Sequence, residues 1–232
     1  MVALIADSEL SFASGDVQWR IEQGTDYPWS SHVGFTLSHR GPGDSQGGAE
    51  RALELKLALP EWIDPASVRV SARGRMLGAG DFASDGRTLT ISGPWADGDR
   101  AHVSFQMPPR RMTAPGGVEI WRGPLRYVAE AADQPGAALA DTTIAPGDSL
   151  RDVPYVLGAL SPADAGARQG DPVTQRPTPE PDAAANSAPN GIMAVMVDRR
   201  ARGLPDLVLV PLAFAGNRGD MQRVGTFAAP AK

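Results

Sequence analysis

The chain has 232 residues, of which 42% are hydrophobic, and this length suffices for one large β-domain or two of about 100 to 130 residues each. Its formal net charge of -5 at pH 7 argues against a nucleic-acid partner, because phosphate contacts need a concentrated basic face. The sequence contains no cysteine, which excludes disulfides, thiolate metal sites and cysteine nucleophiles.

The N-terminal sequence MVALIADSEL has only a short apolar run and no basic segment before it. A secretory signal needs both, so we expect none in the sequence as written. No run of about 18 apolar residues indicates a membrane span. We therefore expect a cytoplasmic protein without a membrane partner, unless the chain is a fragment of a longer protein.

Several short runs with a period of two residues predict β-strands in the first half of the chain. Val17, Trp19 and Ile21 alternate with polar residues, and the sequence TDYPW at residues 25–29 forms a restricted loop because Pro28 has no N–H. Four leucines between residues 53 and 59 alternate with other residues in an amphipathic strand. This strand ends at Pro60, and we expect Trp62 to pack against the core.

A further strand is predicted at residues 101–107, after a turn at Asp97-Gly98-Asp99. Strands at intervals of about 8 to 12 residues, without helical periodicity, indicate an all-β protein with little helix. We expect two packed antiparallel β-sandwich or jelly-roll units. Since the pair Pro108-Pro109 interrupts strand pairing, the units are placed at residues 1–108 and 109–232.

The strand pattern weakens in the second unit. Residues 192–197 and 207–210 are apolar without alternation, which is typical of strands buried on both faces. Residues 171–190 are rich in proline and polar side chains, and we expect a surface loop there.

The residues that could carry chemistry do not form a recognisable catalytic or metal site. His32, His39 and His102 lack metal-ligand spacing. Asp97 and Asp99 are neighbours in a turn, whereas the carboxylates of a glycosidase face each other across the scissile bond. Arg199 and Arg200 are interpreted as solvated ends of a strand. We therefore predict no catalytic residue, no metal and no cofactor.

Several motifs, in order, resemble one known family. They are TDYPW at residues 25–29, Pro60-Glu61-Trp62, WADGD from Trp95, Met107-Pro108, the Gly-Val to Leu-x-Tyr segment at residues 117–127, and the closing segment at residues 209–227. The chain resembles the β-sandwich region C-terminal to the catalytic barrel of glycoside hydrolase family 127, the β-L-arabinofuranosidase-like family. Residues 1–108 resemble its middle domain and residues 109–232 its C-terminal domain.

The resemblance implies that catalysis belongs to an (α/α)6 barrel with a zinc site and a cysteine nucleophile. Because this sequence has no cysteine, no catalytic residue is carried over to it, and we expect no glycosidase activity (EC 3.2.1 class) from the isolated chain. The resemblance further implies that the region braces the barrel or mediates dimerisation. The expected partner is therefore a barrel domain or subunit, or a second copy of the chain.

Two alternatives stay open from the sequence. One is a free-standing carbohydrate-binding module that uses exposed tryptophans, and the other is a self-contained hydrolase that uses carboxylates. Tyr27, Trp29 and Trp121 are the candidate contacts to a partner or a sugar. Trp121 is out of phase with Val118 and Ile120, so it is predicted to lie on the opposite face of its strand from them.

Overall fold

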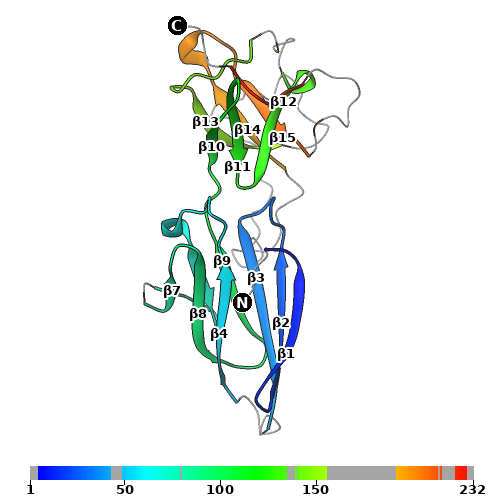
Figure 1. The fold of residues 1–232 in the computed structure, drawn as a ribbon, viewed down its shortest axis with the longest axis vertical. Helices are drawn as coiled ribbons and strands as arrows, with labels where there is room; N and C mark the ends of the chain where they lie inside the picture. The colour runs from blue at the N-terminus through cyan, green and yellow to red at the C-terminus, as the bar shows by residue number, and fades with distance from the viewer. Residues whose placement is uncertain are drawn as a thin grey trace, which may run out of the picture. The chain divides into compact units, whose positions relative to one another are not determined.

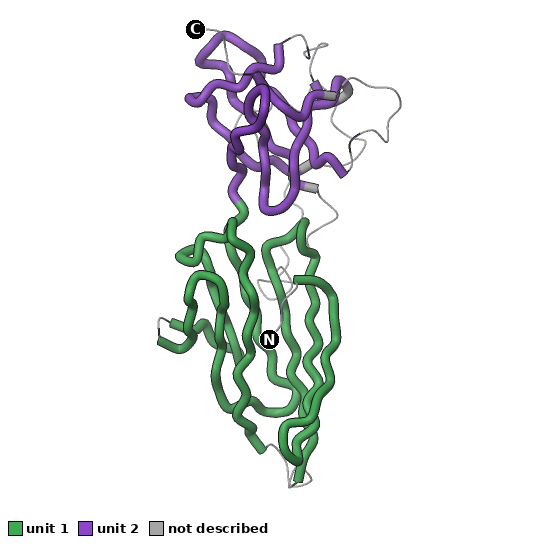
Figure 2. The backbone as a smooth tube through the Cα atoms, viewed as in Figure 1, with its two compact units in different colours: residues 1–107 green, residues 108–232 purple. Residues whose placement is uncertain are grey.

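The computed structural model describes residues 5–42, 49–78, 80–134, 139, 141–155, 192–213, 215 and 223–228. Two units divide the chain, Met1–Met107 and Pro108–Lys232 (Figure 2), where the sequence analysis placed the boundary after Pro108. The described elements are antiparallel β-strands and short 3-10 helices, which confirms the all-β class. The predicted loop at residues 171–190 lies outside the described residues.

Unit 1 is a sandwich of a six-stranded and a three-stranded sheet (Figure 1). The larger sheet has the order β1-β2-β3-β9-β5-β6, with the bounds Ser8–Ser14, Val17–Thr25, His32–Arg40, Asp99–Ser104, Arg69–Ala72 and Arg75–Met76. The smaller sheet has the order β4-β8-β7, with the bounds Arg51–Ala58, Thr88–Trp95 and Phe82–Ser84. A 3-10 helix, Pro65–Ser67, precedes β5 and is capped by the Asp64 side chain.

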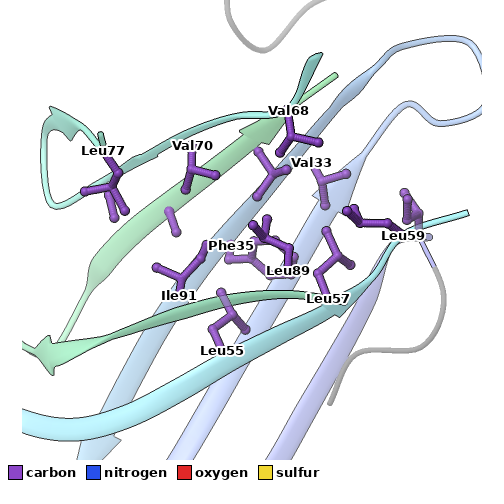
Figure 3. Close-up of a cluster of buried hydrophobic side chains, with 14 of the residues drawn as sticks. Val33, Phe35, Leu55, Leu57, Leu59, Val68, Val70, Leu77, Leu89 and Ile91 are labelled. Atoms are coloured by element: carbon purple, nitrogen blue, oxygen red, sulfur yellow. The ribbon is translucent and has the colours of Figure 1, made fainter. Parts of the chain in front are cut away.

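The core of unit 1 forms where the apolar faces of its two sheets meet. Leu55 and Leu57 of β4 are buried, in register with Ile91 and Leu89 of β8. They lie close to Phe35 of the larger sheet (Figure 3). The predicted alternation of this leucine-rich strand is therefore confirmed, and the two inner faces interdigitate as in other β-sandwiches.

The described strands of unit 2 form a single antiparallel sheet. Its order is β10-β11-β12-β15-β14-β13, with the bounds Pro109–Ala114, Gly117–Arg122, Leu125–Glu130, Leu207–Pro211, Ile192–Asp198 and Ser149–Tyr155, and β16 (Arg223–Val224) also pairs with β12. Two 3-10 helices follow β12 and β14, at Ala131–Asp133 and Arg200–Arg202. Gly117 has a φ of 155°, and its Cα lies so close to the Phe227 carbonyl that a Cβ would meet the oxygen at 2.2 Å.

The sheet of unit 2 curls so that its two edge strands, β10 and β13, lie close to each other. Arg122 of β11 forms an ion pair at 3.1 Å with Asp152 of β13, although the two strands are not neighbours in the sheet. Arg111 of β10 donates a hydrogen bond to the carbonyl oxygen of Asp148, next to β13. In the described part of unit 2, one curled sheet therefore supplies both layers of the predicted sandwich around the core.

The central strands of unit 2 are buried on both faces, as predicted. Val195 and Leu209 belong to the cluster inside the curled sheet, whereas Met196 and Val208 belong to a second cluster on its other face. Strands covered on both sides need apolar residues at successive positions, which explains the missing alternation. Among the described residues, no helix has the length and apolarity that crossing a membrane requires.

Candidate interaction sites

The residues considered for catalysis have structural partners. Asp97 accepts a hydrogen bond at 2.8 Å from the backbone N–H of His39, and Asp99 accepts one at 2.8 Å from that of Ala96. Asp99 therefore caps the turn, as predicted, whereas Asp97 ties the turn to the neighbouring strand β3. His39 is buried, with its ring centroid 4.9 Å from that of Trp19 and its Nε2 3.1 Å from the Trp95 carbonyl oxygen. The described residues include no group of three or more His, Asp or Glu side chains able to hold a metal ion.

The loop between β2 and β3, which carries Tyr27 and Trp29, is held by local hydrogen bonds. The carbonyl oxygen of Asp26 accepts from the backbone N–H groups of Trp29 and Ser30, at 2.8 and 3.0 Å. The hydroxyl oxygen of Thr25 accepts from the Tyr27 N–H at 3.0 Å and donates to the His32 carbonyl at 2.7 Å. These bonds fix the backbone that positions the two rings.

Three aromatic rings from separate segments meet beside this loop. Tyr27 stacks on Trp62, with the ring centroids 6.4 Å apart and the planes 3° from parallel. Trp62 in turn meets Phe105 edge to face, at 5.8 Å and 69°. Tyr27 and Trp62 pack against the core, as predicted for Trp62, and burial raises the pKa of Tyr27. Tyr27 and Trp29 remain partly exposed. The loop therefore presents two aromatic rings at the surface, on a backbone that hydrogen bonds hold in place.

Trp121 lies in a second site, on β11 of unit 2. Ile120 is fully buried and Val118 packs against the inner cluster, whereas Trp121 is partly exposed, as the alternation of the strand predicts. Its Nε1 donates to Glu119 Oε2 at 3.0 Å, and Glu119 Oε1 lies 2.9 Å from an Arg126 nitrogen. We call Glu119, Trp121 and Arg126 the Trp121 patch. The three residues predicted to contact a partner or a sugar thus lie in two sites: Tyr27 and Trp29 in unit 1, and Trp121 in unit 2.

The prediction made for Arg199 from the sequence is wrong. Its side chain is fully buried and is not the solvated strand end that was predicted. The Nε donates to the Pro205 carbonyl at 2.9 Å, and Nη1 donates to the Asp141 carbonyl at 2.8 Å. Burial lowers the pKa of Arg199. No local pattern could have revealed this arrangement, because the Asp141 segment is far away in the sequence.

Arg200 behaves as predicted and is exposed, where it binds Asp198 at 2.5 Å. Its hydrogen bonds lower the pKa of Asp198 to about 2, from a usual value near 3.8. A carboxylate with a lowered pKa in the folded state stabilises that state at higher pH, and the effect is lost as pH falls through about 2.

Asp198→Asn is therefore expected to lower the unfolding midpoint at pH 7, and this difference from the unchanged chain should shrink between about pH 4 and pH 2. Thermal unfolding of both proteins across that range measures it. A difference that stays constant down to pH 2 would show that the ion pair contributes nothing.

The structure is therefore that of an all-β chain with two units. Each unit has one site with partly exposed aromatic side chains. Residues 1–107 match the family model "Beta-L-arabinofuranosidase, GH127 middle domain". This match confirms the resemblance to glycoside hydrolase family 127 for the first unit. A comparison with curated protein sequences found no match.

Solved structures share the fold over 98% of this chain. One is Ara127N-Se, a GH127 β-L-arabinofuranosidase from Geobacillus stearothermophilus T6, with 19% identity and a TM-score of 0.62. Another is described as a glycoside hydrolase, with 19% identity and a TM-score of 0.63, and a third is the GH127 β-arabinofuranosidase BT3674, with 18% identity and a TM-score of 0.60. This chain covers 33%, 35% and 34% of their lengths, which is about a third of each protein.

Proposed function

We propose that this chain is the non-catalytic β-region of a family 127-like glycoside hydrolase and that it supports a catalytic (α/α)6 barrel. The barrel would be carried by the same polypeptide or by a separate subunit. The observation that carries the proposal is the match of residues 1–107 to the GH127 middle domain. The chain also corresponds in fold to about a third of each GH127 structure, so about two thirds of each of those proteins has no counterpart in it.

The loop with Tyr27 and Trp29 is the proposed contact to the barrel. Aromatic side chains are enriched at the centres of protein interfaces, where a few of them carry most of the binding energy. Tyr27 is already stacked on Trp62, and the hydrogen bonds of Asp26 and Thr25 hold the loop. A surface ordered before binding loses little conformational entropy when a partner docks.

Trp29→Ala is expected to weaken binding of the chain to its barrel polypeptide at least about 30-fold, the loss typical of an interface hot spot of about 2 kcal/mol. Isothermal titration of the barrel polypeptide encoded with this chain measures the affinity. Met76→Ala is the control, since Met76 is 63% exposed in the same unit but lies on β6. Equal affinities for the unchanged chain and Trp29→Ala would remove this loop from the interface.

The Trp121 patch favours a second function, carbohydrate binding. A partly exposed indole can stack on a sugar ring while Glu119 and Arg126 hydrogen-bond its hydroxyl groups. Arabinose-containing oligosaccharides should then change the tryptophan fluorescence of the chain in a saturable way, and Trp121→Ala should abolish the change. A saturable response that survives Trp121→Ala would place the sugar elsewhere.

A further inference from the structure

The larger sheet of unit 1 has an outer face that points away from the core. Val33, Phe35 and Leu37 of β3 are buried in the core, and so are Ala101 and Val103 of the neighbouring β9 (Figure 1). The residues between them face the opposite way, because successive side chains of a strand point to opposite faces. We call the outward residues of β3, β9 and β5 the outer face. They are the even-numbered residues of 32–40 and 100–104, together with residues 69 and 71.

The charged side chains of the outer face are all arginines. They are Arg40, Arg69 and Arg100, although the whole chain has a formal net charge of -5. Asp99 is the one acidic residue of these three strands, and its carboxylate caps the turn before β9. Charge complementarity therefore favours an anionic ligand on this face.

The three arginines are not neutralised by acidic side chains in the described part of the chain. Arg69 donates to the carbonyl oxygens of Ala66 and Val68, and none of the three forms an ion pair with a described residue. On the neighbouring β2, Glu22 is already paired with Arg20 at 2.7 Å. The guanidinium groups of the outer face are therefore available to a ligand.

The strand registers place the three arginines at regular intervals. Arg69 is opposite Ser104, and Arg100 precedes Ser104 by four residues on β9. Thr36 is opposite Arg100, and Arg40 follows Thr36 by four residues on β3. Four residues of a strand span about 13 Å, so successive arginines are about 13 Å apart along the strand direction. A linear ligand with repeated negative charges fits this spacing.

Between the first two arginines, the backbone of the sheet is bare. Gly24 of β2 is directly opposite Gly34 of β3, and Gly34 is opposite His102 of β9. A Cβ added to Gly24 would meet no atom within 4 Å, and one added to Gly34 would lie 3.4 Å from His102 Nδ1. Glycine inside a strand often marks a place where a ligand approaches the backbone closely. Ser71 is opposite His102 on the other side and adds a partly exposed hydroxyl group.

We propose that the outer face binds an acidic polysaccharide, a linear sugar chain that carries carboxylate groups. Arginine holds a carboxylate through two parallel hydrogen bonds. The bare glycine backbone leaves room for a sugar ring, whose hydroxyl groups can hydrogen-bond to the side chains of Thr36, Ser71 and His102. The site is separate from the Trp121 patch of unit 2 and requires no barrel, so it goes beyond the proposed function.

The composition of the outer face favours this ligand over other polyanions. The face has no apolar side chain, whereas protein interfaces centre on apolar and aromatic anchors. It also has no Phe, Tyr or Trp on which the bases of a single-stranded nucleic acid could stack. Arginine, hydroxyl groups and imidazole are what remain, and these groups suit carboxylates and sugar hydroxyls.

Arg100→Gln is expected to weaken binding of polygalacturonate to the full chain about tenfold, the usual loss for one charge-assisted hydrogen bond. Isothermal titration at low ionic strength measures the affinity, because salt screens exposed charges. Arg87→Gln is the control, since Arg87 is exposed in the turn between β7 and β8 and its replacement changes the net charge equally. Equal affinities of the two variants would overturn the proposal.

Gly34→Val tests the bare backbone without a change in charge. The fold should accept valine, because the atom nearest to the added Cβ is a side-chain atom at 3.4 Å, and thermal unfolding checks this. Polygalacturonate binding should be lost, since the valine covers the backbone beside His102. Ser92→Val adds a valine to the exposed side of β8 in the smaller sheet and should keep the affinity. Unchanged affinity of Gly34→Val would contradict the proposed site.

Two further polymers test the class of ligand. Fully methyl-esterified polygalacturonate has the same sugar rings without the charges and should not bind. Single-stranded DNA carries phosphates and should bind more weakly than polygalacturonate, because the outer face offers no aromatic ring to its bases. Equal binding of either polymer, or no binding of polygalacturonate, would overturn the proposal. The Trp29 test is independent of these results, since it measures binding of the barrel.

Discussion

Trp95→Ala is expected to reduce the free energy of unfolding of unit 1 by about 3 to 5 kcal/mol, the range for large aromatic truncations in a core. Trp95 has no exposed surface. Its Nε1 donates to the Leu53 carbonyl at 3.0 Å, and the Arg73 guanidinium carbon lies 4.8 Å from its ring centroid. Alanine would leave a cavity, a carbonyl without its donor and a cation without its aromatic partner.

Urea denaturation of the full chain measures this effect on the transition of unit 1. Trp121→Ala is the control, because Trp121 is partly exposed in unit 2 and should leave the unit 1 transition unchanged. A loss below about 1 kcal/mol for Trp95→Ala would mean that unit 1 repacks around the missing ring, against the expectation for a tightly packed core.

Arg199→Met is expected to destabilise unit 2 by about 3 kcal/mol, at about 1 kcal/mol for each of three hydrogen bonds lost from buried groups. The three acceptors are the carbonyl oxygens of Pro205, Asp141 and Thr143. They join the turn after β14 to the segment that precedes β13. Methionine matches the length of the arginine stem but donates no hydrogen bond.

The neighbouring residue supplies the control for this change. Arg200 is exposed and pairs with Asp198, so Arg200→Met should cost less than about 1 kcal/mol, as is usual for surface ion pairs. Urea denaturation of both variants compares them. Equal losses would show that the buried guanidinium contributes no more than a surface charge.

The sequence predicted those parts of the fold that depend on local pattern. The alternating leucines of β4 and the continuous apolar runs at residues 192–197 and 207–210 indicate their own burial, because side-chain direction follows strand periodicity. The curling of the unit 2 sheet depends instead on contacts such as Arg122 with Asp152, between strands that are not adjacent. No periodicity within either strand encodes such a contact.

The candidate sites, too, were predictable only where they depend on the local pattern of a strand. The alternation of β11 predicted that Trp121 faces away from Ile120, and Glu119 shares its face for the same reason. That Arg126 reaches Glu119 depends on the register of the β11 and β12 hairpin. The stacking of Tyr27 on Trp62 joins two loops that only the tertiary fold brings together, so sequence identified the rings and not their contact.

The central claim is that this chain supports a family 127-like barrel and does not itself carry the catalytic residues. Purification of the native protein from its own cells, followed by peptide sequencing and an assay with an aryl β-L-arabinofuranoside, tests this claim most directly. We predict that peptides of a cysteine-containing helical barrel accompany the chain in a one-to-one ratio, and that turnover requires the barrel. Turnover by the isolated 232-residue chain, abolished by a point substitution within it, would contradict the claim.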